Sequence, residues 1–173
     1  MVTAVTGQDA GTQATGVREA AVWRALRTVP DPEIPVVDIV ELGIVRSVIV
    51  DDAGVAVTLT PTFAACPALR VIQEDVAAAV AALGEEVRVT TSLHPPWSSD
   101  DMSDEAREKL RRFGIAPSDR HGGLIQIALD APVRCPRCEH PDTTVRNAFG
   151  STLCREIRTC RSCGETFERF KPI

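Results

Sequence analysis

Two closely spaced cysteine pairs near the end of this sequence carry its clearest chemistry. The motif "CPRC" supplies Cys135 and Cys138, and "CRSCG" supplies Cys160 and Cys163. A tight turn brings the thiolates of each pair to one ion, and four sulfurs at about 2.3 Å satisfy tetrahedral zinc. The 21 residues between the pairs slightly exceed the commonest ribbon spacing, but "TTVRNAFG" and "LCREIRTC" can pair across them as a β-hairpin. These features predict a four-cysteine zinc ribbon.

Other uses of these cysteines stay open at this point. A rubredoxin-like iron site has the same four-sulfur ligand set, and a redox-active CxxC motif is a competing interpretation. Two pairs in a segment of 40 residues without an adequate core of its own favour a structural metal. His140 and Cys154 lie within reach, but the paired cysteines already complete four-coordination, so we predict that neither is a ligand.

The sixth cysteine, Cys66, is isolated in the stretch "TPTFAACPALR" at residues 60–70. Apolar residues that recur from Leu69 to Leu83 predict a helix closed by Gly84, with Cys66 at the N-cap and Pro67 in the first turn. Free N–H groups and the helix dipole stabilise an anion there, so we expect Cys66 to be more thiolate-like than a free cysteine. The alternative is that Cys66 is a small buried hydrophobe.

Carboxylates upstream are candidates for the same site. The motif "DPEIP" supplies Asp31 and Glu33, Asp38 follows shortly after, and all three can approach Cys66 if this loop folds over the helix start. The alternative is a proline-shaped turn whose acids are solvated. Nucleophilic catalysis requires a base and an orienting partner, and none of the three histidines pairs recognisably with Cys66. We therefore predict no catalytic residue.

The elements that must position these residues alternate between helix and strand. Apolar periodicity and turn residues predict helices over 17–29, 36–43, 66–84 and 103–114, the last capped by Ser103 and ended by Gly114, and strands over 45–50, 55–61, 87–93 and 123–129. The predicted fold is a small α/β domain, ordered helix, two strands, helix, strand, helix, followed by a β zinc ribbon. The expected domains are a disordered tail over 1–16, the α/β domain over 17–130 and the ribbon over 131–173.

Composition and charge exclude several classes of protein. The chain has 173 residues with 44% hydrophobic content, no apolar run near the roughly 20 residues of a membrane span, and no secretory signal, so we expect a cytoplasmic protein. Residues 1–133 carry 11 Lys/Arg against 19 Asp/Glu, and residues 134–173 carry 8 against 5. The net negative charge of the first part therefore argues against nucleic-acid binding, and the small positive charge of the second part supports it only weakly.

Two motifs together resemble a known family. "DPEIPVVDIVELGIV" and "TPTFAACPALRVI" are similar to the iron-sulfur assembly domain shared by eukaryotic cytosolic iron-sulfur targeting factors and bacterial SUF-associated proteins. The resemblance covers roughly residues 17–115. It implies that Cys66 lies in a small pocket with the Asp31-Pro32 turn and takes part in maturation or delivery of iron-sulfur clusters. Glu33, Asp38 and Thr60 are further candidates for this pocket.

The C-terminal half, with "CPRC" and "AFGSTLCREIRTCRSCGETFERFKPI", resembles the D-subunit family of the ring 1,2-phenylacetyl-CoA epoxidase system. This resemblance implies a non-enzymatic accessory role in aerobic phenylacetate degradation, beside a di-iron oxygenase and a reductase with flavin and an iron-sulfur cluster. The chain lacks Glu-x-x-His pairs and a glycine-rich nucleotide motif, so it is neither of these components.

Three hypotheses follow. In the first, Cys66 transiently holds iron or a cluster, with a homodimer supplying a further thiol, while the zinc ribbon docks the oxygenase or reductase subunit. In the second, the chain is a structural adaptor of the oxygenase complex that handles no metal. In the third, the ribbon is a nucleic-acid-binding regulator. Its eight basic residues allow this function, but five acidic residues interrupt them.

Overall fold

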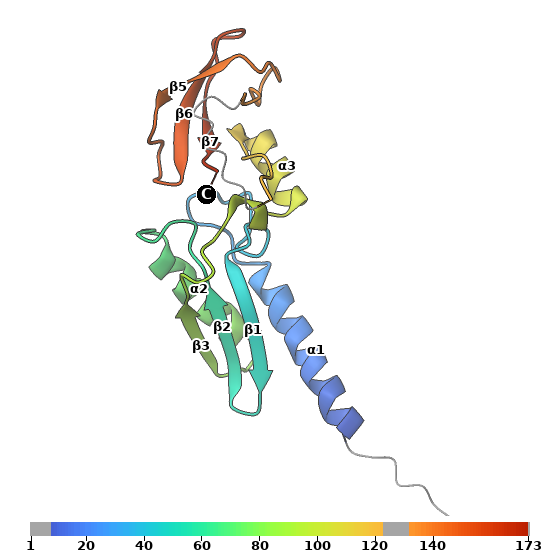
Figure 1. Ribbon diagram of the computed structural model, residues 1–173. Coiled ribbons are helices and arrows are strands. Elements are labelled where there is room, and N and C mark those ends of the chain that lie inside the picture. The colour runs from blue at the N-terminus through green and yellow to red at the C-terminus, as the bar shows by residue number, and fades with distance from the viewer. Residues whose placement is uncertain (1–7, 123–131, 173) are drawn as a thin grey trace, which may run out of the picture.

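The computed structural model describes residues 8–122 and 132–172, with a helix-covered sheet at one end and a β ribbon at the other (Figure 1). In chain order the elements are α1 (Gln8–Leu26), β1 (Val45–Asp51), β2 (Gly54–Leu59), α2 (Leu69–Ala81), β3 (Val87–Thr91), the 3₁₀ turn η1 (Ser99–Asp101), α3 (Asp104–Phe113), β4 (Ile115–Ala116), β5 (Thr143–Asn147), β6 (Arg155–Cys160) and β7 (Thr166–Phe170). This order confirms the predicted α/β fold. In the described ranges, no helix combines the length and apolar character that spanning a membrane requires.

Helix α1 begins earlier than the sequence pattern predicts. Val22 and Leu26 on its inner face are fully buried, and Arg18 pairs with Glu85 beyond the end of α2 at 2.6 Å. Residues 8–16, expected to be part of a disordered tail, continue this helix. They contain no proline, and extending a helix that is already nucleated and packed is far easier than starting one. The rest of the expected tail, residues 1–7, and the expected strand over 123–129 lie outside the described residues.

The N-terminal sheet has the order β1-β2-β3 and contains the predicted strands. β1 and β2 form an antiparallel hairpin, and β3 lies parallel to β2 because α2 crosses over between them. Gly54 at the hairpin turn has a φ of +122°, and a Cβ on it would lie 2.4 Å from the Glu86 carbonyl oxygen. This glycine therefore lets the turn approach the start of β3 closely. Helix α2 covers the sheet with the buried side chains of Ile72, Val76 and Val80.

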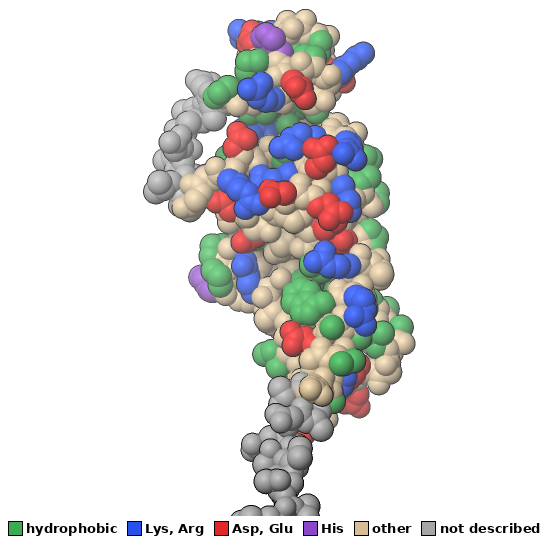
Figure 2. All heavy atoms as spheres, turned by 90° about the vertical axis from the view of Figure 1, so that its right-hand side faces the viewer, with side chains coloured by type: hydrophobic (Ala, Val, Ile, Leu, Met, Phe, Trp, Pro, Cys, Tyr) green, Lys and Arg blue, Asp and Glu red, His purple; other side chains and the backbone are tan. Residues whose placement is uncertain are grey.

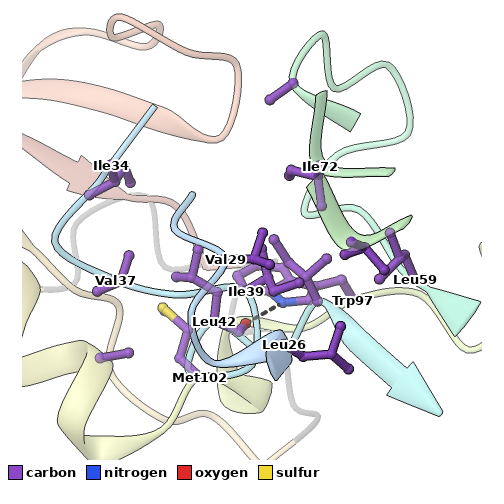
Figure 3. Close-up of a cluster of buried hydrophobic side chains, with 14 of the residues drawn as sticks. Leu26, Val29, Ile34, Val37, Ile39, Leu42, Leu59, Ile72, Trp97 and Met102 are labelled. Carbon is purple, nitrogen blue, oxygen red and sulfur yellow. Dashed lines mark hydrogen bonds between the residues drawn. The ribbon is translucent and has the colours of Figure 1, made fainter. Parts of the chain in front are cut away.

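The loop before β1 corrects a second expectation, because the helix expected over 36–43 is a series of turns. Asp38 Oδ1 accepts hydrogen bonds from the N–H groups of Val40 and Glu41, both at 2.8 Å, which competes with helical bonding. Gly43 has a φ of +73°, and a Cβ there would lie 2.5 Å from the Asp101 carbonyl oxygen. The loop is thereby pressed into the core, where it buries Val37, Ile39 and Leu42 (Figure 3).

Helix α3 has the ends that the sequence predicts. Ser103 Oγ accepts a hydrogen bond from the Ala106 N–H at 3.0 Å, and Gly114 closes the helix in the left-handed conformation with a φ of 92°. The chain then enters β4 directly. Because β4 is the first strand of the C-terminal sheet, α3 connects the two halves of the molecule.

The C-terminal sheet has the order β4-β7-β6-β5 and shares a core with the N-terminal half. β5 and β6 form the predicted hairpin, whereas β7 and its parallel pairing with β4 were not predicted. Phe170 at the end of β7 is 1% exposed, and its ring centroid lies 6.0 Å from that of Trp97. Trp97 Nε1 in turn donates to the Leu42 carbonyl at 2.8 Å (Figure 3). The expected modules, 17–130 and 131–173, therefore pack as one body along this contact.

Candidate metal centre and thiol pocket

The four paired cysteines converge on one point in the ribbon. The Sγ atoms of Cys135, Cys138, Cys160 and Cys163 all lie within 4.8 Å of one another. Cys135 Sγ is 3.8 Å from Cys163 Sγ, and Cys138 Sγ is 3.6 Å from Cys160 Sγ. A tetrahedral ion with bonds of about 2.3 Å separates its sulfur ligands by about 3.8 Å. The cysteines are therefore already spaced as the ligands of one tetrahedral ion.

Matching backbone turns hold the two cysteine pairs. In the first, the Glu139 N–H donates to the Cys135 carbonyl at 2.8 Å, and in the second the Gly164 N–H donates to the Cys160 carbonyl at 3.0 Å. Both donors have a positive φ, 58° for Glu139 and 76° for Gly164. Each turn is thus closed by its own backbone hydrogen bond, although Glu139 occupies a conformation that favours glycine.

The protonation of these thiols differs although they are neighbours. At Cys160 a hydrogen bond from the Cys163 N–H outweighs burial and lowers the pKa of the thiol to about 7. At Cys138 the His140 N–H lowers the pKa, but hydrogen bonds with Cys163 and burial outweigh it and raise the pKa to about 12. Adjacent thiolates disfavour one another's ionisation, and a bound cation removes that conflict. The site is therefore suited to a cation that takes four thiolates.

Neither His140 nor Cys154 belongs to this group of four donor atoms. His140 Nδ1 accepts a hydrogen bond from the Asp142 N–H at 3.2 Å, so the ring orders its own turn. Cys154 belongs to the main core of the molecule, which contains residues of the N-terminal half. The fifth thiol of the ribbon is thus separated from the metal centre.

Cys66 lies in the turn that precedes α2, and its environment corrects the expectation of a helix cap. The N-cap of α2 is Ala68, and the Cys66 N–H instead donates to the Phe63 carbonyl at 3.0 Å. Burial raises the pKa of the Cys66 thiol, against the lowering effect of the Ala68 N–H, and Glu33 and Asp31 raise it further. The prediction of a thiolate-like Cys66 is therefore wrong, because desolvation and nearby carboxylates outweigh the helix terminus.

Asp31 and Glu33 do reach Cys66, since all three line one small cavity of about 10 Å³. Asp31 Oδ1 accepts hydrogen bonds from the N–H groups of Glu33 at 2.9 Å and Ile34 at 2.8 Å, which fixes the loop over the thiol. Burial raises the pKa of both carboxyl groups, and the guanidinium of Arg155 opposes the rise in each case. Asp31 is 7% exposed, so the alternative of a turn with solvated acids does not hold for this residue.

Asp38 and Thr60, the other two pocket candidates, are not among the residues that line this cavity. Asp38 organises the turn to Glu41, and Glu41 Oε1 lies 2.6 Å from Lys109 Nζ on α3. Thr60 is fully buried, and its Oγ1 accepts a hydrogen bond from Arg46 Nε at 3.3 Å. Both residues therefore hold the framework around the pocket.

Sequence reasoning missed the contribution of the ribbon to this pocket. Cys154 and Phe170 line the cavity with Cys66, although they are 88 and 104 positions further along the chain. Their spacing in the sequence contains no signal of this contact. One hint was available, since a fifth cysteine beside a complete four-cysteine set has no explained role.

Comparisons with known proteins match two separate parts of the chain. Residues 19–92 match the iron-sulfur cluster assembly protein family, and residues 123–171 match the PaaD zinc beta ribbon domain. A crystal structure of a domain of unknown function, DUF59, from Bacillus anthracis covers 57% of this chain and 96% of its own, with 32% identity and a TM-score of 0.54. The fold and the four-cysteine centre thus define an iron-sulfur assembly domain joined to a zinc-ribbon domain.

The relatives narrow the class further. A protein of Escherichia coli named as the D component of a 1,2-phenylacetyl-CoA epoxidase is 40% identical over 153 residues, which cover 88% of this chain and 92% of that protein. YitW of Bacillus subtilis, named as an Fe-S protein maturation auxiliary factor, is 41% identical over 89 residues, covering 50% of this chain and 86% of its own. The chain belongs to the D-subunit family of phenylacetyl-CoA epoxidases.

Proposed function

We propose that this protein is a non-catalytic accessory subunit that matures or delivers the iron or iron-sulfur centre of a partner in a phenylacetyl-CoA epoxidase system. In this role Cys66 handles the metal, and the ribbon, holding structural zinc, docks the client. The relatives named as Fe-S maturation auxiliary factors support the role in maturation, and the D-subunit relative supports the link to an epoxidase system.

The observation that carries this proposal is the placement of Cys66 with Asp31 and Glu33 in one cavity. A thiol and two carboxylates are donors for ferrous iron, and a thiol is the usual donor to a cluster. The raised pKa values of all three groups keep them protonated more readily than in water. Proton competition therefore weakens metal binding, which suits a carrier that must release its cargo.

Zinc is the ion that we assign to the ribbon. The four sulfurs are spaced for tetrahedral coordination, and the matched domain is a zinc ribbon. When bound, zinc contributes to folding by holding the two turns together, because the ribbon has a small core of its own, made of Ala116, Val133, Cys135, Cys160 and Phe167.

The experiment that tests the maturation role compares client proteins made with two versions of this chain. The oxygenase and reductase subunits are co-produced with wild type or with Cys66→Ser, purified, and measured for iron. We expect one client to be iron-poor with Cys66→Ser, and that client identifies the recipient. Ala64→Ser, on the exposed part of the same turn, is the matched control and leaves both clients loaded.

A structural adaptor is the second candidate, and the ribbon surface favours it. Val145, Phe149 and Leu153 are 45%, 58% and 43% exposed, and among residues 8–122 and 132–172 β5 is an edge strand of its sheet. Exposed apolar side chains beside an open strand edge are typical of a docking surface. If this candidate is correct, Cys66→Ser leaves both clients fully loaded, whereas loss of the ribbon cysteines abolishes association with them.

The surface gives little support to the nucleic-acid regulator. On the face drawn in Figure 2, Lys and Arg side chains alternate with Asp and Glu side chains. Arg111 and Arg112 on α3 both pair with Glu108, at 3.2 and 2.9 Å. Cations that are neutralised in this way offer little attraction to phosphate groups. Salt-dependent binding to DNA or RNA would reinstate this hypothesis.

A further inference from the structure

Cys154 lines the same cavity as Cys66, although the two residues come from different domains. Cys66 precedes α2, whereas Cys154 lies in the connection between β5 and β6. Their cavity of about 10 Å³ is also lined by Asp31, Glu33 and Phe170. The Cys154 side chain is 6% exposed and belongs to the main core. The contact between domains thus places two thiols and two carboxyl groups around one small cavity, with Asp31 and Cys154 buried and Cys66 and Glu33 half-buried.

Contacts within the ribbon hold Cys154 at this point. Its Sγ lies 3.1 Å from Thr152 Oγ1, and its carbonyl oxygen accepts a hydrogen bond from the Lys171 N–H at 2.9 Å. Thr152 Oγ1 also accepts from Arg155 Nε at 2.8 Å. The folded ribbon therefore fixes the second thiol, and does so independently of the four sulfurs of its metal centre.

We propose that Cys154 is the second thiol ligand of the iron that Cys66 handles, and that the pocket takes a single ferrous ion with two sulfur and two carboxylate donors. This inference rests on the proposed maturation function and specifies its site. Each thiol, and each carboxyl group that is protonated, gives its proton to solvent as its bond to iron forms, so the ion replaces these protons and no electron is transferred. A second thiol within one chain also removes the need for a homodimer.

The size of the cavity selects an ion rather than a cluster. A space of about 10 Å³ is close to the minimum that one water molecule occupies. One ion with its ligands around it fits that space, whereas a cluster adds at least two irons and two bridging sulfides. A cluster therefore requires the ribbon to separate from the N-terminal domain, which would expose Phe170.

The charge of the pocket also suits a divalent cation. Two thiolates and two carboxylates carry four negative charges, of which the ion neutralises two. Arg155 lies close enough to Asp31 and Glu33 to favour their ionised forms, and its NH1 pairs with Glu168 Oε2 at 2.6 Å. This arginine follows Cys154 directly, so the same segment supplies a proposed ligand and a cation whose charge the pocket shares with Glu168.

The pocket differs from the ribbon centre in how closely its donor atoms are gathered. Among the described residues, the four ribbon sulfurs are the one group of three or more potential ligands whose donor atoms all lie within 4.8 Å. The donors around Cys66 must therefore move inward to bind an ion. That reorganisation lowers the affinity, as expected for cargo that is passed on.

A metal titration of the full chain tests this site. The protein, with zinc in the ribbon, is titrated without oxygen with Co²⁺ as a spectroscopic substitute for Fe²⁺. We expect wild type to bind one Co²⁺ with the thiolate-to-metal absorption of two sulfurs. Cys154→Ser and Cys154→Ala should each lose about half of this absorption and bind Co²⁺ at least about tenfold more weakly. Leu153→Ala, at the exposed neighbouring position, is the control that should match wild type.

The outcomes separate this inference from the proposed function. Unchanged zinc content in each variant shows that the ribbon is folded and that Co²⁺ has not replaced zinc. If both Cys154 variants bind Co²⁺ as wild type does while Cys66→Ser does not, the two-thiol site is wrong and a role for Cys66 stands. If wild type takes up no Co²⁺ beyond the zinc site, the ion site is overturned, and the iron content of the client still tests maturation separately.

Discussion

The ribbon centre and the pocket that we propose around Cys66 use the same donor atom in opposite ways. In the ribbon, local turns place four sulfurs at the spacing of a tetrahedral ion, with Sγ–Sγ separations of 3.6 and 3.8 Å. Around Cys66, by contrast, the loop over 30–38, the turn before α2 and the ribbon each contribute donors, and burial raises the pKa of the thiol. A preorganised set of ligands retains an ion, whereas a protonated, open set favours exchange.

This difference teaches that affinity for a metal depends on whether the fold has already assembled the ligands. The Cys163 N–H lowers the pKa of Cys160 to about 7, so part of the ribbon is ready for a cation near neutral pH. At Cys66, by contrast, burial raises the pKa by more than the hydrogen bond from the Ala68 N–H lowers it. Four experiments test this contrast, in order of decreasing effect.

The largest effect is expected from breaking the ribbon centre with Cys160→Ser. Structural zinc contributes about 10 kcal/mol or more to small metal domains, so this variant should lose zinc and the protection of β5 and β6. Metal analysis and hydrogen exchange measure the two losses. Since binding requires deprotonated sulfurs, wild type should also release zinc as the pH falls, and Cys154→Ser should not change that release. Full zinc content in Cys160→Ser would contradict the four-sulfur centre.

A smaller effect is expected from Phe170→Ala, which weakens the contact between the two domains. Phe170 is 1% exposed and touches both the Cys66 cavity and Trp97, so its removal should cost about 3 to 5 kcal/mol of unfolding free energy. Urea unfolding measures this loss. Phe149→Ala is the control, because Phe149 is 58% exposed and its ring contacts Lys171. We expect this substitution to lower the unfolding free energy by about 1 kcal/mol or less. Equal losses would show that the ring at 170 does not join the domains.

Asp31→Asn sharpens the contrast by removing a charge from the pocket. Burial raises the folded-state pKa of Asp31, so the folded protein holds this proton more tightly than the unfolded chain. Stability from this group is therefore present at acid pH and lost as the pH rises through the folded pKa. Asparagine keeps an oxygen acceptor for the Glu33 and Ile34 N–H groups, so we expect a modestly higher urea midpoint at neutral pH. The difference in urea midpoint from wild type should shrink as the pH falls towards the ordinary pKa of aspartate. A difference that stays constant with pH would show that the protonation of Asp31 does not affect stability.

The smallest effect is expected at the backbone of the ribbon turns. Glu139 has a φ of 58°, so Glu139→Gly should relieve strain and stabilise the zinc-bound form by about 0.5 kcal/mol after the entropy of glycine is counted. Gly164→Ala at the matching position should destabilise it by about 1 to 2 kcal/mol. Thermal unfolding in the presence of zinc compares the two. Opposite signs support a positive φ at both turn positions, and equal signs contradict it.

Much of the fold could be predicted because its signals are local. The helical face of α2, the Ser103 and Gly114 ends of α3 and the hairpins β1–β2 and β5–β6 all follow from residue spacing and turn residues. Two of the failures depend on contacts made elsewhere in the chain. Gly43 accommodates Asp101, and the turns around it replace the expected helix, while β7 pairs with the two-residue strand β4, which is too short to leave a pattern.

For the sites, the sequence by itself determined the ribbon centre, because each CxxC turn places its sulfurs through bonds within five residues. It also indicated Cys66, Asp31 and Glu33. Only the tertiary structure decided that Asp38 and Thr60 stay outside the pocket and that burial raises the pKa of Cys66. It also brought Cys154 to Cys66 across 88 positions. The physical reason is that desolvation and distant contacts depend on how two domains pack, which no local spacing encodes.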